Sequence, residues 1–168
     1  HYHPDNIIDN TFLEDLGIDT NHEWIMQRVG IEQRRTILSL DYIKKTKNKD
    51  LAQARSHALM SSAKTGAIAA QRALDHAGLT PQDIGMVISG GCDPEYLLPA
   101  NASVIAAELG IDAESFDINS ACSTFATQLH TLNRMRPESL ADFILLVIPE
   151  NWTATIDYSD RSTAVLIG

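Results

Sequence analysis

Short apolar runs alternate with helix-like segments through the second half of the chain. Residues 86–89, 143–148 and 163–167 are mostly apolar runs of strand length, and residues 116–118, which carry Asp117 between two apolar residues, are predicted to be a further strand. Continuous apolar strands separated by helical segments are typical of a parallel sheet buried on both faces. The pattern therefore predicts an α/β fold with a mainly parallel central sheet.

Helical spacing of apolar residues lies between these runs. It extends over residues 50–77, where alanine is frequent, and Gly78 is placed to end that helix. Further helices are predicted over residues 100–109 and from the residue after Cys122 to about residue 135. Residues 31–50 show no clear period and are predicted to be irregular.

The N-terminal segment predicts two more helices. Residues 4–10 are expected to form a turn, with no strand before it, and Thr11 can cap a short helix through Leu16. Thr20 is followed three residues later by Glu23, the spacing of a capping box. The helix that it would open carries Trp24 and ends near Gly30.

Composition limits the class of protein but does not give its function. The chain has 168 residues, of which 44% are hydrophobic and 21% charged, as expected of one soluble globular domain. No apolar run approaches the roughly 20 residues of a membrane helix, and no signal peptide is expected. Cys92 and Cys122 are too few for a disulfide framework or a structural zinc site, which favours a reducing, cytoplasmic setting.

The charge is negative overall but uneven along the chain. A net charge of −9 argues against a general nucleic-acid binder. Basic residues nevertheless outnumber acidic ones between positions 28 and 49. They are Arg28, Arg34, Arg35, Lys44, Lys45, Lys47 and Lys49. This stretch is either a solvated surface or a contact area for an anionic partner, and the sequence leaves both open.

Cys122 is the main candidate for chemistry. It is predicted at a junction where a strand ends and a helix begins, the place where functional groups gather in parallel sheets. Unpaired N–H groups at a helix start favour a thiolate and can hold a thioester oxygen as negative charge develops on it. Position alone also allows a small buried hydrophobic residue. Cys92 lacks a following helix start, which favours a structural role.

The residues around Cys122 resemble the active-site motif of β-ketoacyl-(acyl carrier protein) synthase III, a thiolase-fold condensing enzyme. That motif, Asp-x-x-x-Ala-Cys-x-x-Phe, is matched by Asp117, Ala121, Cys122 and Phe125. Other segments resemble the family in the same order along the chain. They are residues 20–31 with Arg34 and Arg35, residues 73–84, and residues 160–168.

The resemblance implies a thiolase-like fold. Residues 1–168 would be the N-terminal half of a duplicated α/β/α/β/α layered architecture, truncated at both ends and without its C-terminal half. In the family a histidine and an asparagine of that other half complete the catalytic set. None of the six histidines here lies in a matching motif, and His130 is expected to be structural. The catalytic set is thus expected to be incomplete, and no metal or cofactor is implied.

The resemblance also implies a reaction. Cys122 would accept an acyl group, which is then joined to a malonyl or β-ketoacyl thioester by decarboxylative Claisen condensation. Coenzyme A or acyl carrier protein thioesters would be substrates, in fatty acid or specialised (resorcinol- or polyketide-like) biosynthesis. Two alternatives stay open: a non-catalytic partner subunit of a ketosynthase heterodimer, and a thiolase-fold synthase that joins two acyl chains. The presence of Cys122 counts against the first, because such subunits often lose the cysteine.

Several binding roles follow from the same resemblance. Trp24 would stack on the adenine of coenzyme A beside Arg28, although Ala154 stands near the position of the family's second adenine-flanking arginine. Phe125 would lie at the substrate site. Leu98 would enter the acyl pocket of the partner subunit in a homodimer, and would leave a longer pocket than the usual aromatic residue.

A carrier protein would also need a basic surface, because acyl carrier proteins are acidic. The residues expected to meet it near the tunnel mouth are Arg34, Arg35, Lys44, Lys45 and Lys47.

Overall fold

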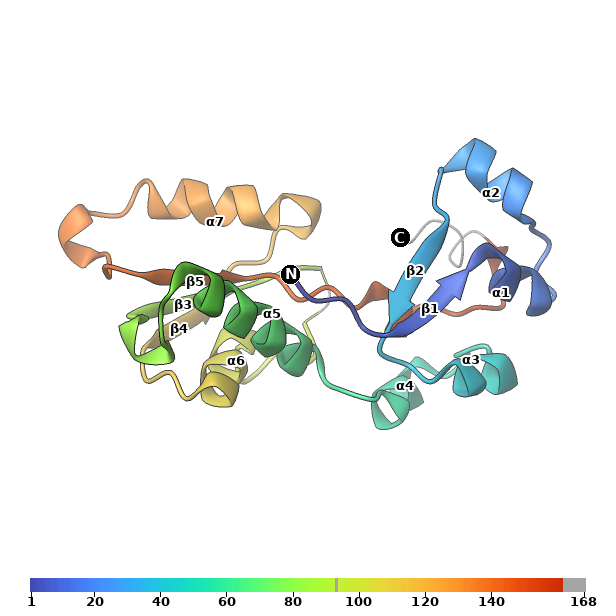
Figure 1. The fold of residues 1–168 in the computed structure, drawn as a ribbon, viewed down its shortest axis with the longest axis horizontal. Helices are drawn as coiled ribbons and strands as arrows, with labels where there is room; N and C mark the ends of the chain where they lie inside the picture. The colour runs from blue at the N-terminus through green and yellow to red at the C-terminus, as the bar shows by residue number, and fades with distance from the viewer. Residues whose placement is uncertain (93, 162–168) are drawn as a thin grey trace. The chain divides into compact units, whose positions relative to one another are not determined.

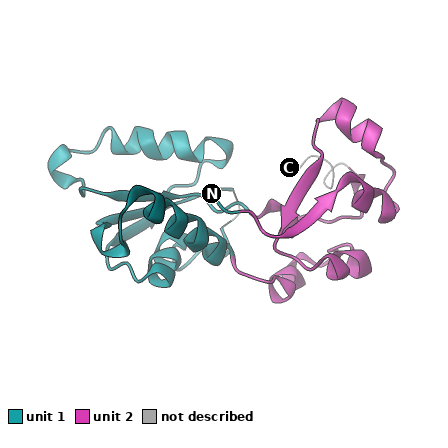
Figure 2. Ribbon diagram, viewed as in Figure 1, with its two compact units in different colours: residues 1–2, 62–150 teal, residues 3–61, 151–168 magenta. Residues whose placement is uncertain are grey.

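The computed structural model describes residues 1–92 and 94–161 and divides the chain into two compact units (Figure 2). Unit 1 contains residues 1–2 and 62–150, and unit 2 contains residues 3–61 and 151–168. Among the described residues, no helix has both the length and the apolar character needed to cross a membrane.

Unit 1 is built on a three-stranded parallel sheet with the order β4-β3-β5. Its strands are β3 (Met86–Ser89), β4 (Glu114–Asp117) and β5 (Ile144–Val147). These are three of the four strands that the apolar runs predict, and the predicted parallel arrangement is confirmed. The fourth predicted strand, residues 163–167, lies outside the described residues.

Helices cover both faces of this sheet. Figure 1 shows α5 (Ser62–Ala77) and α6 (Asn101–Leu109) on one side and α7 (Thr124–Leu132) on the other. Small residues let α5 approach closely: a Cβ added at Gly66 would lie 3.0 Å from Ile105 Cδ1. The buried cluster on this side joins both helices to the sheet through Ala63, Ala67, Ala70, Leu74, Val87, Ala102, Ile105, Leu145 and Val147. Short 3₁₀ turns, η1 (Pro81–Asp83) and η3 (Pro137–Ser139), lead into β3 and β5.

Unit 2 contains a two-stranded antiparallel sheet that the sequence did not predict. β1 (Asn6–Asp9) pairs with β2 (Gln33–Thr36). The predictions of an N-terminal turn and of irregular structure over residues 31–50 are therefore wrong. The helices of the unit are α1 (Asn10–Asp15), α2 (His22–Arg28), α3 (Leu40–Thr46) and α4 (Leu51–His57), with the 3₁₀ turn η4 (Trp152–Ala154). β1 has only two apolar residues, Ile7 and Ile8, and β2 is polar even at its buried positions, Arg34 and Thr36.

The long helix predicted over residues 50–77 is two helices, α4 and α5. Ala58 is extended, with φ −70° and ψ 135°, and forms an isolated β-bridge with Leu38. Leu59 N–H then donates to the carbonyl of Ile37 at 2.8 Å. These tertiary hydrogen bonds interrupt a sequence whose alanine content favours a continuous helix.

The cap of α2 also differs from the predicted one. Asn21, not Thr20, is the N-cap, and its side-chain oxygen accepts a hydrogen bond from Trp24 N–H at 2.8 Å. Asparagine is as good a cap as serine or threonine, so the helix begins one residue later than the capping-box spacing suggests.

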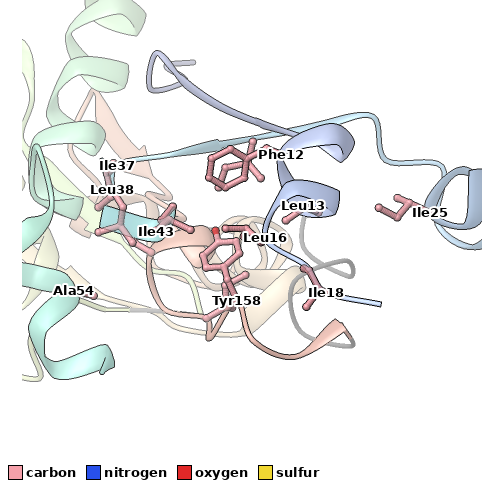
Figure 3. Packing of buried hydrophobic residues seen from close by; sticks show 13 residues of the cluster. Phe12, Leu13, Leu16, Ile18, Ile25, Ile37, Leu38, Ile43, Ala54 and Tyr158 are labelled. Carbon is pink, nitrogen blue, oxygen red and sulfur yellow. The ribbon is translucent and has the colours of Figure 1, made fainter. Parts of the chain in front are cut away.

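Tyr158 lies in the core of unit 2 (Figure 3). Its side chain is 1% exposed, and its hydroxyl donates to the carbonyl of Thr153 at 2.7 Å. Its backbone N–H donates to the carbonyl of Lys47 at 2.8 Å. Asn48 extends this connection, because its Nδ2 donates to the carbonyls of Ala154 and Ile156. Residues 151–158 are thereby fixed to the segment that follows α3.

Burial raises the pKa of Tyr158, and the nearby positive charge of Arg34 opposes this rise only in part. The folded state therefore holds the phenolic proton more tightly than the unfolded state. This contribution to stability is complete below the unfolded pKa of about 10 and is lost as the pH rises above it.

The substitution Tyr158→Phe tests this coupling. At pH 8 the wild type should be more stable by about 1 kcal/mol, because the variant leaves the Thr153 carbonyl without its donor. Above about pH 10 the difference in the free energy of unfolding should shrink, because only the wild type can ionise at this position. Urea unfolding of both proteins at pH 8 and pH 11 measures it, and a difference that does not change with pH would contradict the account.

Candidate active site

The three strands of unit 1 end at the same level. Ser89 at the end of β3 is paired with Asp117 of β4 and with Val147 of β5. The segments that follow the strands, residues 90–92, 118–122 and 148–150, therefore leave from one edge of the sheet. In parallel sheets this carboxyl edge is where sites form.

Gly90 lets the chain after β3 pass against the chain after β4. A Cβ added at Gly90 would lie 1.9 Å from the carbonyl oxygen of Ile118, a distance that no side chain can tolerate. Ile118 N–H donates to Ser89 O at 2.8 Å, which continues the pairing beyond the strands. Gly91 N–H donates to the side-chain oxygen of Asn119 at 3.0 Å. The two segments thus reach the site as a pair.

Asp117 joins the end of β4 to the start of α6. Its two carboxylate oxygens accept hydrogen bonds from Asn101 N–H and Ala102 N–H, each at 2.8 Å. The N-cap residue of α6 is Ala100, which has no capping side chain, so the aspartate supplies the cap and suits the helix dipole. Sequence reasoning quoted this aspartate only as part of a motif. The alanine at the N-cap could have indicated that a side chain from another element caps this helix.

Glu150, after β5, holds the segment that contains Cys92. Its Oε1 accepts a hydrogen bond from Cys92 N–H at 2.9 Å. A Cβ at Gly91 would lie 2.6 Å from the same oxygen, so the carboxylate is close to the backbone. Cys92 is half-buried, and this contact involves its backbone. Glu150 was not predicted as a site residue, because no local sequence pattern indicates a hydrogen bond to a residue 58 positions away.

Cys122 is exposed and is not disulfide bonded. It lies in the 3₁₀ turn η2 (Ala121–Ser123), and α7 begins at Thr124, one residue later than predicted. Ala121 immediately before it has φ +48°, in the left-handed region. This conformation costs a non-glycine residue about 1–2 kcal/mol and needs surrounding contacts to maintain it.

Side-chain hydroxyls supply those contacts. Thr124 Oγ1 accepts from Ser120 N–H at 3.0 Å and donates to the Ala121 carbonyl at 2.7 Å. Ser123 Oγ donates to the Ser120 carbonyl at 2.7 Å and lies 2.9 Å from Ser120 Oγ. The turn that presents Cys122 is therefore closed by hydrogen bonds within five residues.

The helix that follows Cys122 has two different faces. Thr124 and Gln128 are buried, while Phe125 and Leu129 are exposed by 55% and 47%. Each pair is four residues apart and so lies on one face. The predicted site residue Phe125 is thus near Cys122 in the chain and on an open apolar face. His130 contacts Arg134 on the exposed side of the same segment.

Leu98 lies in the connection between β3 and α6 and is 80% exposed. Its neighbours Tyr96 and Leu97 are also exposed, which places three large side chains in solvent in this described segment. The role of Leu98 in the acyl pocket of a partner subunit stays a prediction.

Trp24 and Arg28 belong to unit 2, whereas Cys122, Phe125 and Leu98 belong to unit 1. The guanidinium carbon of Arg28 lies 5.4 Å from the centroid of the Trp24 ring. A second guanidinium, of Arg161, lies 4.8 Å from that ring and also donates to Asp19. Sequence reasoning missed Arg161 as a neighbour of Trp24.

The expected basic contact area is smaller than predicted. Arg34 is only 3% exposed and donates to Asn10 Oδ1 at 2.8 Å, so its assignment to an exposed patch is wrong. Burial lowers the pKa of Arg34, and the side-chain oxygen of Asn10 compensates for the lost water. Arg35 is half-buried against the carbonyl of Pro4. What remains at the end of α3 is the exposed pair Lys44 and Lys45 with the half-buried Lys47 beside them, here called the α3 patch.

Comparisons with known proteins agree with this arrangement. A family model described as 3-oxoacyl-[acyl-carrier-protein (ACP)] synthase III matches residues 116–168. The β-ketoacyl-[acyl-carrier-protein] synthase III of Dinoroseobacter shibae is 36% identical over the whole of this chain, which covers 46% of that protein. The chain therefore spans about half the length of the curated relatives it matches.

Solved structures give the same result. The 3-oxoacyl-[acyl-carrier-protein] synthase III from Aquifex aeolicus matches 99% of this chain and 48% of its own, with a TM-score of 0.81 and 28% identity. The priming β-ketosynthase of the R1128 polyketide pathway matches 99% of this chain and 44% of its own, with a TM-score of 0.80 and 30% identity.

The chain has the thiolase-like fold of these synthase structures, of which it covers about half. It is similar along its whole length to β-ketoacyl-[acyl-carrier-protein] synthase III proteins, and its residues 116–168 match the family model.

Proposed function

We propose that this chain is the acyl-accepting part of a β-ketoacyl synthase III-type acyltransferase, with Cys122 as the nucleophile. One observation carries the proposal: Cys122 is exposed on a strained turn at the carboxyl edge of a parallel sheet. A buried structural cysteine would not need a left-handed alanine before it. The similarity to synthase III proteins over the whole chain supports the same reaction class.

The first step is acyl transfer to sulfur. The Cys122 thiolate attacks the carbonyl carbon of an acyl thioester, and a new carbon–sulfur bond forms. The bond to the carrier sulfur breaks, and the carrier leaves as a thiol after taking up the proton that Cys122 has given up. The negative charge that develops on the oxygen would have to be met by N–H donors near the sulfur.

The second step is condensation. A malonyl thioester loses carbon dioxide, and the resulting carbanion attacks the acyl carbon on Cys122. A carbon–carbon bond forms as Cys122 leaves as a thiolate. The product is a β-ketoacyl thioester, for fatty acid or specialised acyl biosynthesis.

We further propose that these residues are the N-terminal half of the duplicated fold. The remaining half would supply the histidine and asparagine that the resemblance implies. Two facts support this: the chain covers 46% of its relative from Dinoroseobacter shibae, and α7 carries the exposed apolar residues Phe125 and Leu129. The same facts support the expectation that this chain is inactive alone.

Two other functions remain alternatives. A non-catalytic ketosynthase partner subunit has no need of an exposed cysteine on a strained turn, so Cys122 disfavours it. A synthase that joins two acyl chains would use Cys122 in the same first step and differ in its second substrate.

Acylation of the full-length protein tests the proposal. After mixing with an acyl thioester of coenzyme A or acyl carrier protein, intact mass spectrometry should show one acyl adduct per chain. Peptide mapping should place this adduct on Cys122, because its thiol is exposed on the strained turn. The variant Cys122→Ala should show no adduct.

Cys92→Ala is the matched control, since Cys92 is the other cysteine of the chain and also follows a strand of the sheet. It should acylate like the wild type. An adduct that persists in Cys122→Ala, or a wild type that never becomes acylated, would contradict the proposed role.

A carrier protein is the partner that we propose for the α3 patch. Lys44 and Lys45 are exposed in the last turn of α3, and an acidic protein would be attracted to them. The double reversal Lys44→Glu/Lys45→Glu should weaken carrier binding about tenfold at low salt, the equivalent of two exposed ion pairs. The loss should shrink as salt is added.

Calorimetric titration with acyl carrier protein at two salt concentrations measures this effect. Arg134→Glu/Arg136→Glu is the matched control, because it makes the same change of net charge at exposed positions in unit 1. Equal weakening by both double variants would mean that net charge alone is responsible, and the α3 patch would lose its assignment.

A further inference from the structure

One buried hydroxyl connects the two residues that precede Cys122. Thr124 Oγ1 accepts from the backbone N–H of Ser120 and donates to the backbone carbonyl of Ala121. Its donor and acceptor capacities are both used on the turn. The hydroxyl therefore sets the backbone on either side of the Ser120–Ala121 peptide.

Thr124 is fixed from the other side by the sheet. Its side chain is 1% exposed, and its methyl Cγ2 would lie 2.9 Å from a Cβ at Gly90. The hydroxyls of Ser120 and Ser123, which also bond within the turn, lie toward solvent. Of the three side chains whose hydroxyls bond within the turn, Thr124 is the one that also packs against the end of β3.

Ala121 is the residue that needs this support. Its φ of +48° is unfavourable for alanine, and the conformation persists only if its surroundings determine it. Without the Thr124 hydroxyl, Ser120 N–H would lose its acceptor, and the Ala121 carbonyl would keep only the bond from the Thr124 backbone N–H. Ala121 could then relax to a negative φ. The next residue, Cys122, would then point in another direction.

We propose that Thr124 is a positioning residue for Cys122. Its hydroxyl holds Ala121 in the left-handed conformation, so that the thiol projects from the turn toward the acyl carbonyl. This inference rests on the proposed role of Cys122 as the nucleophile.

The test uses single-turnover acylation of the full-length protein. Thr124→Val keeps the shape of the side chain and removes the hydroxyl. The acylation rate at saturating thioester should fall about 10- to 100-fold, with little change in the concentration for half-maximal rate, because the thiol is misplaced while the substrate still binds. Thr124→Ser keeps the hydroxyl and should stay within about threefold of the wild type.

A second variant addresses the mechanism directly. Adding Ala121→Gly to Thr124→Val should restore much of the lost rate, because glycine adopts a positive φ without support. If Thr124→Val does not fold, Thr124→Ser and Thr124→Ala give the same comparison, since both lack the methyl and they differ in the hydroxyl. Ser should then acylate at least tenfold faster than Ala.

Thr131→Val is the matched control on the same helix. The Thr131 hydroxyl donates within α7, to the carbonyl of Thr127 at 2.8 Å, so its loss should leave the acylation rate unchanged. Wild-type rates in Thr124→Val, or an equal loss in Thr131→Val, would overturn the positioning role. Absence of an adduct on Cys122 in the wild type would instead overturn the proposed function, so the two failures are distinguishable.

Discussion

The parallel pairing of β3 with β4 and β5 is the constraint on which the candidate site depends. It brings Ser89, Asp117 and Val147 to one level, so three chain segments leave the sheet together. Gly90 then allows backbone contact where any side chain would collide with Ile118. The Ile118 N–H bond to the Ser89 carbonyl continues the pairing past the strands and so satisfies backbone groups at the start of the turn.

From this edge the contacts pass outward in two directions. Asp117 caps α6 with both carboxylate oxygens, which ties one covering helix to the end of β4. Thr124 ties α7 to the backbone before Cys122. The strain at Ala121 is thus held between a sheet and a helix, and we interpret it as part of how the thiol is presented.

Sequence patterns predicted most clearly the strands and helices with a strong apolar signal. β3 and β5 are continuous apolar runs, and α6 has a clear helical period and ends at Gly110. The pairing of β1 with β2 was not predicted, because β2 has the polar sequence Gln-Arg-Arg-Thr. Burial of Arg34 in β2 depends on a hydrogen bond to Asn10, which lies 24 residues away in the chain. Long-range hydrogen bonds leave no periodic signal in the chain.

The site was predictable in position but not in geometry. The order of strand and helix indicated Cys122 as a candidate, and the family resemblance implied its role. The sequence pattern does not reveal the left-handed conformation of Ala121 or the two hydrogen bonds of the Thr124 hydroxyl. Asp117 and Glu150 act on backbone groups far along the chain, so their roles also needed the fold.

A crystal structure of the full-length protein, solved after reaction with an acyl thioester, is the most direct test of this account. The account expects electron density for an acyl group continuous with Cys122 Sγ, with Ala121 still at a positive φ and Thr124 still bonded to its carbonyl. An acyl group on Cys92, or an acylated Cys122 that follows an Ala121 with negative φ, would contradict it.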